Sequence, residues 1–178
     1  MIEISFAAGQ CVVVLGWILF RLAAYLKNKK IDWKQEAKQL FFLVNLLVIY
    51  RCTFHPFSKV DGRVQPLVFD SAAILPFWLN LVPIKNLLDY EIRSELLINL
   101  IGNVTMFIPT GVMTPMIYKK LKSFPKTLLT GAMISLVIEI LQLPFAGRAS
   151  DVDDLILNTL GCVIGYGIYA LVRKLKRK

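Results

Sequence analysis

Long apolar runs alternate with short basic segments along this chain, and that pattern predicts its elements. Five runs are long enough, at about 20 residues each, to cross a hydrocarbon core roughly 30 Å thick. They cover residues 4–26, 39–57, 96–118, 127–145 and 152–172. The second run is the least regular, because its purely apolar part stops at Tyr50, just before Arg51. We therefore expect an all-α fold, a polytopic transmembrane helical bundle of about five spans.

The segments between the runs predict the orientation of the bundle. With five spans, the first connection, the third connection and the C-terminal tail all lie on the same side of the membrane. The positive-inside rule assigns that side to the cytoplasm, which places the N-terminus outside and the C-terminus inside. The basic residues concerned are Lys27, Lys29, Lys30, Lys34 and Lys38, then Lys119, Lys120, Lys122 and Lys126, then Arg173, Lys174, Lys176, Arg177 and Lys178.

Residues 66–84 form a further apolar stretch that could be taken for a sixth span. They carry Asp70, Pro76, Asn80 and Pro83, and a full crossing would move the lysines of the third connection to the outside. We therefore expect an external re-entrant or interfacial segment, with Trp78 near the lipid headgroups.

The composition agrees with a membrane protein. Of the 178 residues, 56% are hydrophobic, and the mean hydropathy is +0.60, which is too apolar for an ordinary soluble domain. The net charge of +9 comes from short clusters between apolar runs rather than from one patch, so we expect no nucleic-acid partner. The first run lacks the basic start and the cleavage site of a signal peptide. We expect one integral membrane domain over residues 1–178.

Residues 139–165 concentrate the polar groups that lipid would exclude. Asp151, Asp154, Asn158, Gly161 and Gly165 follow each other at intervals of three or four residues, so they share one face of a helix. Acidic side chains are costly against hydrocarbon. That face must therefore contact protein or water.

Comparable faces occur on three other predicted helices. Each carries its polar residues toward the expected outer end, which predicts that four helices bring these groups together in one chamber open to the outside. The faces consist of Arg51, Cys52 and His55 on the second run, Asn99, Asn103, Met106 and Thr110 on the third, and Gly131, Ser135, Glu139 and Gln142 on the fourth.

Each of these features also has a purely structural interpretation. Asn45, Ser135 and the two glycines of the last run are typical of helix packing. Glu139 is an intramembrane carboxylate, which indicates either a functional site or a structural ion pair, with Arg51 or Arg148 as its counter-ion. Arg148, Asp151 and Asp154 also have two interpretations. They belong either to the functional site of Glu139, or to a solvated turn followed by an acidic helix N-terminus.

The cysteines and the single histidine give no independent indication of chemistry. Cys11, Cys52 and Cys162 are too few and too deep in apolar sequence for a disulfide framework or a metal motif. His55 precedes Pro56 at the expected membrane surface, and we interpret it as incidental rather than catalytic.

Several segments of the chain match a known family. They are YRCTFHP (50–56), NLVP (80–83), NLIGNVTMFIPTG (99–111), EILQ (139–142) and RASDVDDLILNTLGCVIGY (148–166). In these segments the sequence resembles the VanZ-like family of bacterial membrane proteins, named for an accessory protein of teicoplanin resistance. The likeness reaches from about residue 50 to residue 166 and leaves out the first span, 4–26.

The resemblance implies a bacterial plasma-membrane protein connected with the cell envelope and with susceptibility to glycopeptide or lipoglycopeptide antibiotics. It does not imply a particular reaction. By matching position, the polar set of the family would be Asn99, Asn103, Glu139, Gln142, Arg148, Asp151, Asp154 and Asn158.

Our first hypothesis is an outward-facing site for an anionic or polyol lipid headgroup, a lipid-linked envelope precursor or a lipoglycopeptide. Arg51 and Arg148 would hold phosphate or carboxylate, and the asparagines would add directional hydrogen bonds. We expect no cofactor. A divalent cation held by Glu139 and the aspartates is a weaker alternative, because the sequence has no calcium-loop pattern.

Three other classes of function stay open. An enzyme acting on an envelope lipid would use Glu139 or Asp154 for acid–base catalysis. The sequence has no nucleophile elbow, paired metal-spaced histidines or phosphate-binding glycine loop, so we favour a binding protein over an enzyme. The chain could instead be a scaffold or accessory subunit. Transport is the remaining alternative, and five spans would then require a homo-oligomer.

Overall fold

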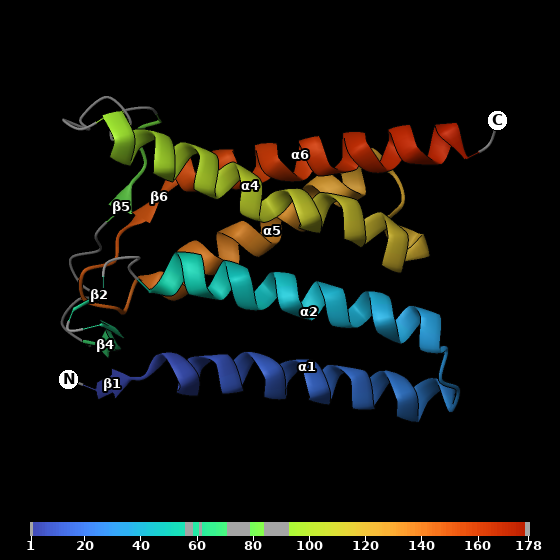
Figure 1. Ribbon diagram of the computed structural model, residues 1–178, viewed down its shortest axis with the longest axis horizontal. Coiled ribbons are helices and arrows are strands. Elements are labelled where there is room, and N and C mark those ends of the chain that lie inside the picture. Colours follow the sequence, from blue (N-terminus) through green and yellow to red (C-terminus); the bar gives the residue numbers. More distant parts are fainter. Residues whose placement is uncertain (1, 56–58, 61, 71–78, 84–92, 177–178) are drawn as a thin grey trace. The chain divides into compact units, whose positions relative to one another are not determined.

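The computed structural model describes residues 2–55, 59–60, 62–70, 79–83 and 93–176 (Figure 1). Five helices in this part of the chain are long and apolar enough to cross a membrane, so the expected all-α transmembrane bundle is confirmed. They are α1 (Phe6–Asn28), α2 (Trp33–Phe54), α4 (Arg93–Ile117), α5 (Phe124–Gln142) and α6 (Val152–Leu175). The chain divides into two compact units, Met1–Phe69 and Asp70–Lys178, and each is described by itself. A single membrane domain stays a prediction.

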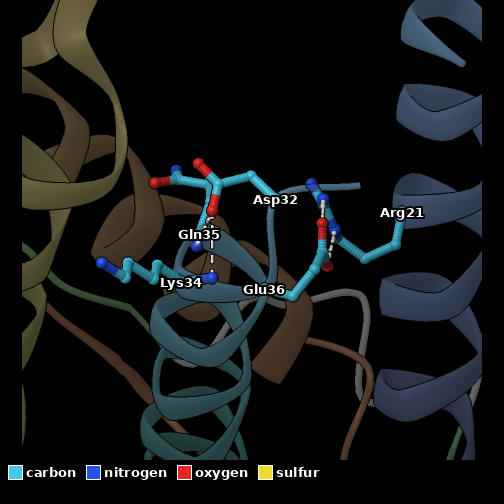
Figure 2. A network of polar contacts seen from close by, with 5 residues as sticks. All are labelled: Arg21, Asp32, Lys34, Gln35 and Glu36. Carbon is cyan, nitrogen blue, oxygen red and sulfur yellow. Dashed lines mark hydrogen bonds and ion pairs between the residues drawn. The ribbon is translucent and has the colours of Figure 1, made fainter. Parts of the chain in front are cut away.

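The first unit is built on an antiparallel pair of helices, α1 and α2 (Figure 1). Ser5 caps α1 by accepting a hydrogen bond from the Ala8 amide at 3.2 Å, and α1 ends at Lys29, which adopts a left-handed conformation with φ of 50°. Asp32 then caps α2 by accepting from the amides of Lys34 and Gln35 (Figure 2). These caps satisfy helix-end groups that have no partner within the helix, so a short connection can reverse the chain.

Short strands accompany the helices of this unit. Glu3 is the register partner of Val68 in one antiparallel pair, and Val60 is the register partner of Arg63 in the other. The strands are β1 (Ile2–Ile4) with β4 (Leu67–Phe69), and β2 (Lys59–Val60) with β3 (Arg63–Val64). The apolar pattern did not predict them, because strands of two or three residues are too short to show a period of two.

His55 is fully buried at the end of α2 and holds this end of the unit together. Its Nδ1 lies 3.0 Å from the carbonyl oxygen of Gln65, and because a carbonyl only accepts, Nδ1 carries the proton. In the neutral ring, Nε2 then accepts from the Tyr50 hydroxyl at 2.9 Å. The ring of Phe6 packs edge-on against the imidazole. His55 therefore has a structural role in the first unit.

In the second unit, α4 and α6 pack closely, and α5 lies against both (Figure 1). A Cβ atom at Gly111 would overlap the backbone carbonyl of Cys162, and one at Gly161 would overlap that of Val104. One at Gly165 would overlap the carbonyl of Ile108. These glycines let two backbones approach each other directly, as small residues do in membrane bundles.

Many residues of the predicted polar faces of these three helices lie on the sides that pack inward. These sides carry polar side chains near the turn between α5 and α6, and several small or hydroxyl-bearing residues further along. The buried residues include Met106, Thr110 and Thr114 on α4, Thr127, Gly131, Ser135, Glu139 and Gln142 on α5, and Asp153, Asn158, Gly161, Cys162 and Gly165 on α6.

Two short strands close one end of this unit. β5 (Leu79–Asn80) pairs in parallel with β6 (Ser150–Asp151), and Asn80 is the register partner of Asp151. The turn between α5 and α6 has Gly147 at φ of 72°, a conformation that glycine adopts without strain. Of the predicted external segment 66–84, residues 71–78 and 84, including Trp78, lie outside the described residues. Its re-entrant or interfacial character stays a prediction.

Candidate functional site

Asp151 is the centre of the candidate site. It caps the N-terminus of α6, where its Oδ1 accepts from the Asp153 amide at 2.9 Å and from the Asn80 side-chain amide at 2.9 Å. Its own backbone N–H donates to Glu139 Oε2 at 2.9 Å. Asp151 thus joins the end of α5, the start of α6 and strand β5 through three hydrogen bonds.

Asn103 provides the link to α4. Its Nδ2 donates to Asp154 Oδ1 at 2.6 Å and to Asn99 Oδ1 at 3.3 Å. Both hydrogens of this amide are therefore used within the protein. Asn103 orients the Asp154 carboxylate, which projects from the first turn of α6.

Asn158 lies one turn further along α6 than Asp154 and is only 1% exposed. Its Nδ2 donates to the Ser135 hydroxyl of α5 at 2.9 Å. Its Oδ1 is buried and accepts no hydrogen bond from the described residues. A buried amide oxygen without a donor is costly, so this position can accept a hydrogen bond from a group that enters the site.

The electrostatic character of the site is acidic. Glu139 is 4% exposed, and the carboxylates of Asp151 and Asp154 lie near enough to interact with it. Its hydrogen bonds come from the Asp151 amide and the Ser150 side chain. Both of these partners are uncharged hydrogen-bond donors.

The expected arginine counter-ion of Glu139 stays a prediction. A backbone N–H and a hydroxyl from β6 reach the carboxylate, because the strand runs past the end of α5. Arg148 lies in the preceding turn and is half-buried, with its amide bonded to the Phe145 carbonyl at 3.1 Å. Arg51 belongs to the first unit, where it donates to the His55 carbonyl at 2.8 Å and lies over the Phe6 ring.

The structure thus brings together most of the predicted site residues. We call this group the acid–amide cluster; Gln142, another predicted member, is buried on the same face of α5. The cluster consists of Asn80, Asn99, Asn103, Glu139, Asp151 and Asp154, with Ser135 and Asn158 as its deeper part.

The side chains of the acid–amide cluster determine whether it can bind a metal ion or another ligand. Among the described residues, no three histidine, cysteine or acidic side chains are arranged to hold a metal ion. The carboxylates instead accept hydrogen bonds from amides. This arrangement can bind a ligand through several hydrogen bonds, and its buried carboxylates are in principle able to exchange a proton with that ligand.

A comparison with protein-family models identifies the family of the chain. The family model described as VanZ/LLP1 matches residues 41–173, which is most of the sequence. The chain belongs to the VanZ/LLP1 family. Together with its five spanning helices, this makes it a multi-pass membrane protein.

One curated relative supports the VanZ/LLP1 assignment. Protein VanZ of Enterococcus faecium is 37% identical over 75 residues, which cover 42% of this chain and 46% of the relative. The chain therefore spans about half the length of the curated relative that it matches. No solved structure matches this VanZ/LLP1 chain.

The VanZ/LLP1 match contains the whole acid–amide cluster but begins after α1 and the first turns of α2. Two residues that hydrogen-bond to the predicted carboxylates were missing from the predicted set. Asn80 lies in the NLVP segment that resembles the family, so this segment could have indicated Asn80 as a site residue. Ser150 had no signal, because only the pairing of β5 with β6 brings it to Glu139.

Proposed function

We propose that this chain binds the hydroxyl- or ammonium-bearing headgroup of an envelope lipid, a lipid-linked envelope precursor or a lipoglycopeptide at the acid–amide cluster. Through this binding it contributes to tolerance of teicoplanin-type glycopeptides. The positive-inside rule puts the cluster on the outer side of the membrane, where these molecules are exposed.

The observation that carries the proposal is the predominance of hydrogen-bond acceptors in the cluster. The amide of Asn103 is used by Asp154 and Asn99, and the amide of Asn80 is used by Asp151. The carboxylates of Glu139 and Asp154 accept and do not donate when ionised, and the amide oxygen of Asn158 is likewise an acceptor. A ligand that presents several donors, such as a sugar or an aminosugar, complements this set better than a phosphate does.

The position of the cluster favours an amphipathic ligand. Glu139 lies in the last turn of α5, and Asp154 lies in the first turn of α6, so both are at the headgroup level of a spanning bundle. A ligand with a lipid tail would keep the tail in the bilayer while its polar part enters the cluster. This geometry supports binding at the outer leaflet rather than transport through the bundle, whose α4–α6 contact is closed by backbone packing.

A binding experiment tests the proposal directly. Purified protein in nanodiscs would be titrated with a glycosyl diacylglycerol, with phosphatidylglycerol and with teicoplanin, and occupancy would be read by native mass spectrometry. We expect the glycolipid and teicoplanin to be retained over phosphatidylglycerol, and Glu139→Gln or Asp154→Asn to abolish the retention. Glu3→Gln is the matched control, because it makes the same change at an exposed carboxylate.

The same variants separate this function from its alternatives. In cells, Glu139→Gln should accumulate to the normal level in the membrane while teicoplanin tolerance is lost. A scaffold would instead lose protein level and phenotype together. An enzyme would change the mass of the bound lipid during incubation, whereas a binding protein would release it unchanged. Equal retention of phosphatidylglycerol and the glycolipid would contradict the donor-rich ligand.

A further inference from the structure

The first unit contains a cavity that the proposed function does not use. It has a volume of about 660 Å³ and lies between α1 and α2, near their lysine-rich connection. Its walls combine apolar and polar groups. They include Trp17, Arg21, Tyr25, Lys30, Trp33 and Glu36. All of its lining residues precede residue 41, where the family match begins, so the cavity belongs to the part of the chain outside that match.

The two carboxylates of this region are already engaged. Glu36 forms an ion pair with Arg21, whose Nε lies 3.1 Å from Glu36 Oε2 (Figure 2). Asp32 accepts two backbone amides of the first turn of α2. The lysines of the connection form no ion pair with other described residues, and they leave this end of the unit with an excess of positive charge.

Trp17 adds a hydrogen-bond donor inside the cavity. Its indole Nε1 is buried and donates to no other described residue, although a buried indole N–H usually finds an acceptor. Trp17 lies about three turns before the C-terminal end of α1, whereas Lys30 follows that helix. A ligand that fills the cavity can therefore offer an acceptor to Trp17 and an anionic group to the lysines at the mouth.

We propose that this cavity binds an anionic phospholipid from the leaflet on the lysine-rich side, which the positive-inside rule makes the cytoplasmic leaflet. The phosphate lies near Lys30, the ester carbonyls come next toward Trp17, and the acyl chains follow Ile18 and Leu22, which line the cavity. The volume is within the usual range for ligand pockets. Basic clusters beside a membrane helix are typical of anionic-lipid recognition.

The Arg21–Glu36 pair has a defined part in this proposal. By neutralising Arg21, Glu36 leaves the charge at the mouth of the cavity to Lys30. Replacing Glu36 with glutamine releases the guanidinium, so the preference of the cavity for anionic lipid should rise. The ion pair thereby limits how tightly the lipid is held.

Fluorescence quenching of Trp17 tests the proposal in the full chain. Trp33→Phe and Trp78→Phe leave Trp17 as the single tryptophan, because the sequence has three. The protein is reconstituted in phosphatidylcholine vesicles that contain brominated phosphatidylglycerol or, separately, brominated phosphatidylcholine. We expect brominated phosphatidylglycerol to quench Trp17 at a lower mole fraction, by about fivefold for each basic residue that contacts the phosphate.

Two lysine variants make the test specific. Lys30→Gln should remove most of the preference, whereas Lys34→Gln should keep it, because both side chains are exposed but only Lys30 lines the cavity. Glu36→Gln should increase the preference. Equal quenching by the two lipids overturns the proposal. An absence of quenching by either lipid also overturns it, since it would show that protein fills the cavity.

Discussion

Asn158 and Ser135 form the deepest hydrogen bond of the acid–amide cluster. Both side chains are at most 1% exposed, and the bond joins α5 to α6 at 2.9 Å. Because the unfolded state in a membrane also finds hydrogen-bond partners, such pairs stabilise by less than burial alone suggests. The bond therefore fixes the relative rotation of two helices more than it adds to stability.

A double-mutant cycle measures this contribution. Asn158→Ala, Ser135→Ala and the double variant should give a coupling free energy of about 0.6 kcal/mol, the average for such bonds in membranes. Unfolding by sodium dodecyl sulfate in mixed micelles provides the free energies. Thr130 is a suitable comparison site on α5, since its hydroxyl makes an exposed hydrogen bond to the Lys126 carbonyl of the same helix. A coupling energy of zero would show that the bond is absent in the membrane.

Tyr50 gives a second prediction for a single residue. Tyr50→Phe keeps the ring packing but removes the hydroxyl that bonds His55 Nε2, so a fully buried imidazole nitrogen loses its partner. The free energy of unfolding should fall by about 1–3 kcal/mol, the cost of an unsatisfied buried group. Tyr25→Phe is the control, because Tyr25 is 45% exposed. An equal effect of both variants would contradict the structural role of His55.

The sequence predicted which residues would meet but not what they would bond to. Helical spacing was enough to put Asp154, Asn158 and Glu139 on inward faces, because the period of a helix is regular. It could not show that Glu139 accepts the Asp151 amide of β6. That hydrogen bond depends on the path of a turn, and turn geometry has no comparable period.

Among the elements, the contact of α4 with α6 depends most on single residues. Gly161 and Gly165 allow the backbone carbonyls of α4 to touch α6. Gly167, on the same helix, has open space where a Cβ would be. Gly167 can therefore serve as the control for substitutions at Gly161 and Gly165.

Alanine substitution distinguishes these glycines. Gly161→Ala and Gly165→Ala should each lower the free energy of unfolding by about 1–3 kcal/mol, the usual cost of overpacking, because the new methyl group would displace a backbone rather than a flexible side chain. Gly167→Ala should be neutral or stabilising by up to about 1 kcal/mol, since alanine favours the helix. A common effect at all three positions would indicate that α4 and α6 are further apart than described.

Element boundaries show where sequence patterns stop being informative. The predicted spans agree with the helices, since a hydrophobic run of about 20 residues is a strong signal. The exception is α2, which begins at Trp33 rather than near residue 39. Its first turns are polar, and the cap provided by Asp32 extends the helix beyond the apolar run.

At the scale of the molecule, the family match and the two units divide the chain differently. The match begins at residue 41, within α2, whereas the units meet between Phe69 and Asp70. The acid–amide cluster lies wholly in the second unit and inside the match. The α1–α2 cavity lies wholly in the first unit and before the match. Of the predicted chamber, the parts on α4, α5 and α6 lie in the second unit and the part on α2, with Arg51, lies in the first.

The orientation of the whole bundle decides what each site can meet. If the lysine-rich connections are cytoplasmic, the turn between α5 and α6 faces outward and the cluster can reach glycopeptides and envelope precursors.

Labelling of single cysteines in intact cells tests this orientation. The variant Cys11→Ser, Cys52→Ser and Cys162→Ala provides the cysteine-free background. Ala149→Cys, at an exposed position of that turn, should react with a membrane-impermeant maleimide. Lys120→Cys, exposed after α4, should react only once the membrane is permeabilised. The reverse pattern would place the cluster in the cytosol and remove any direct encounter with teicoplanin, while the lipid cavity beside Trp17 would then face the outer leaflet.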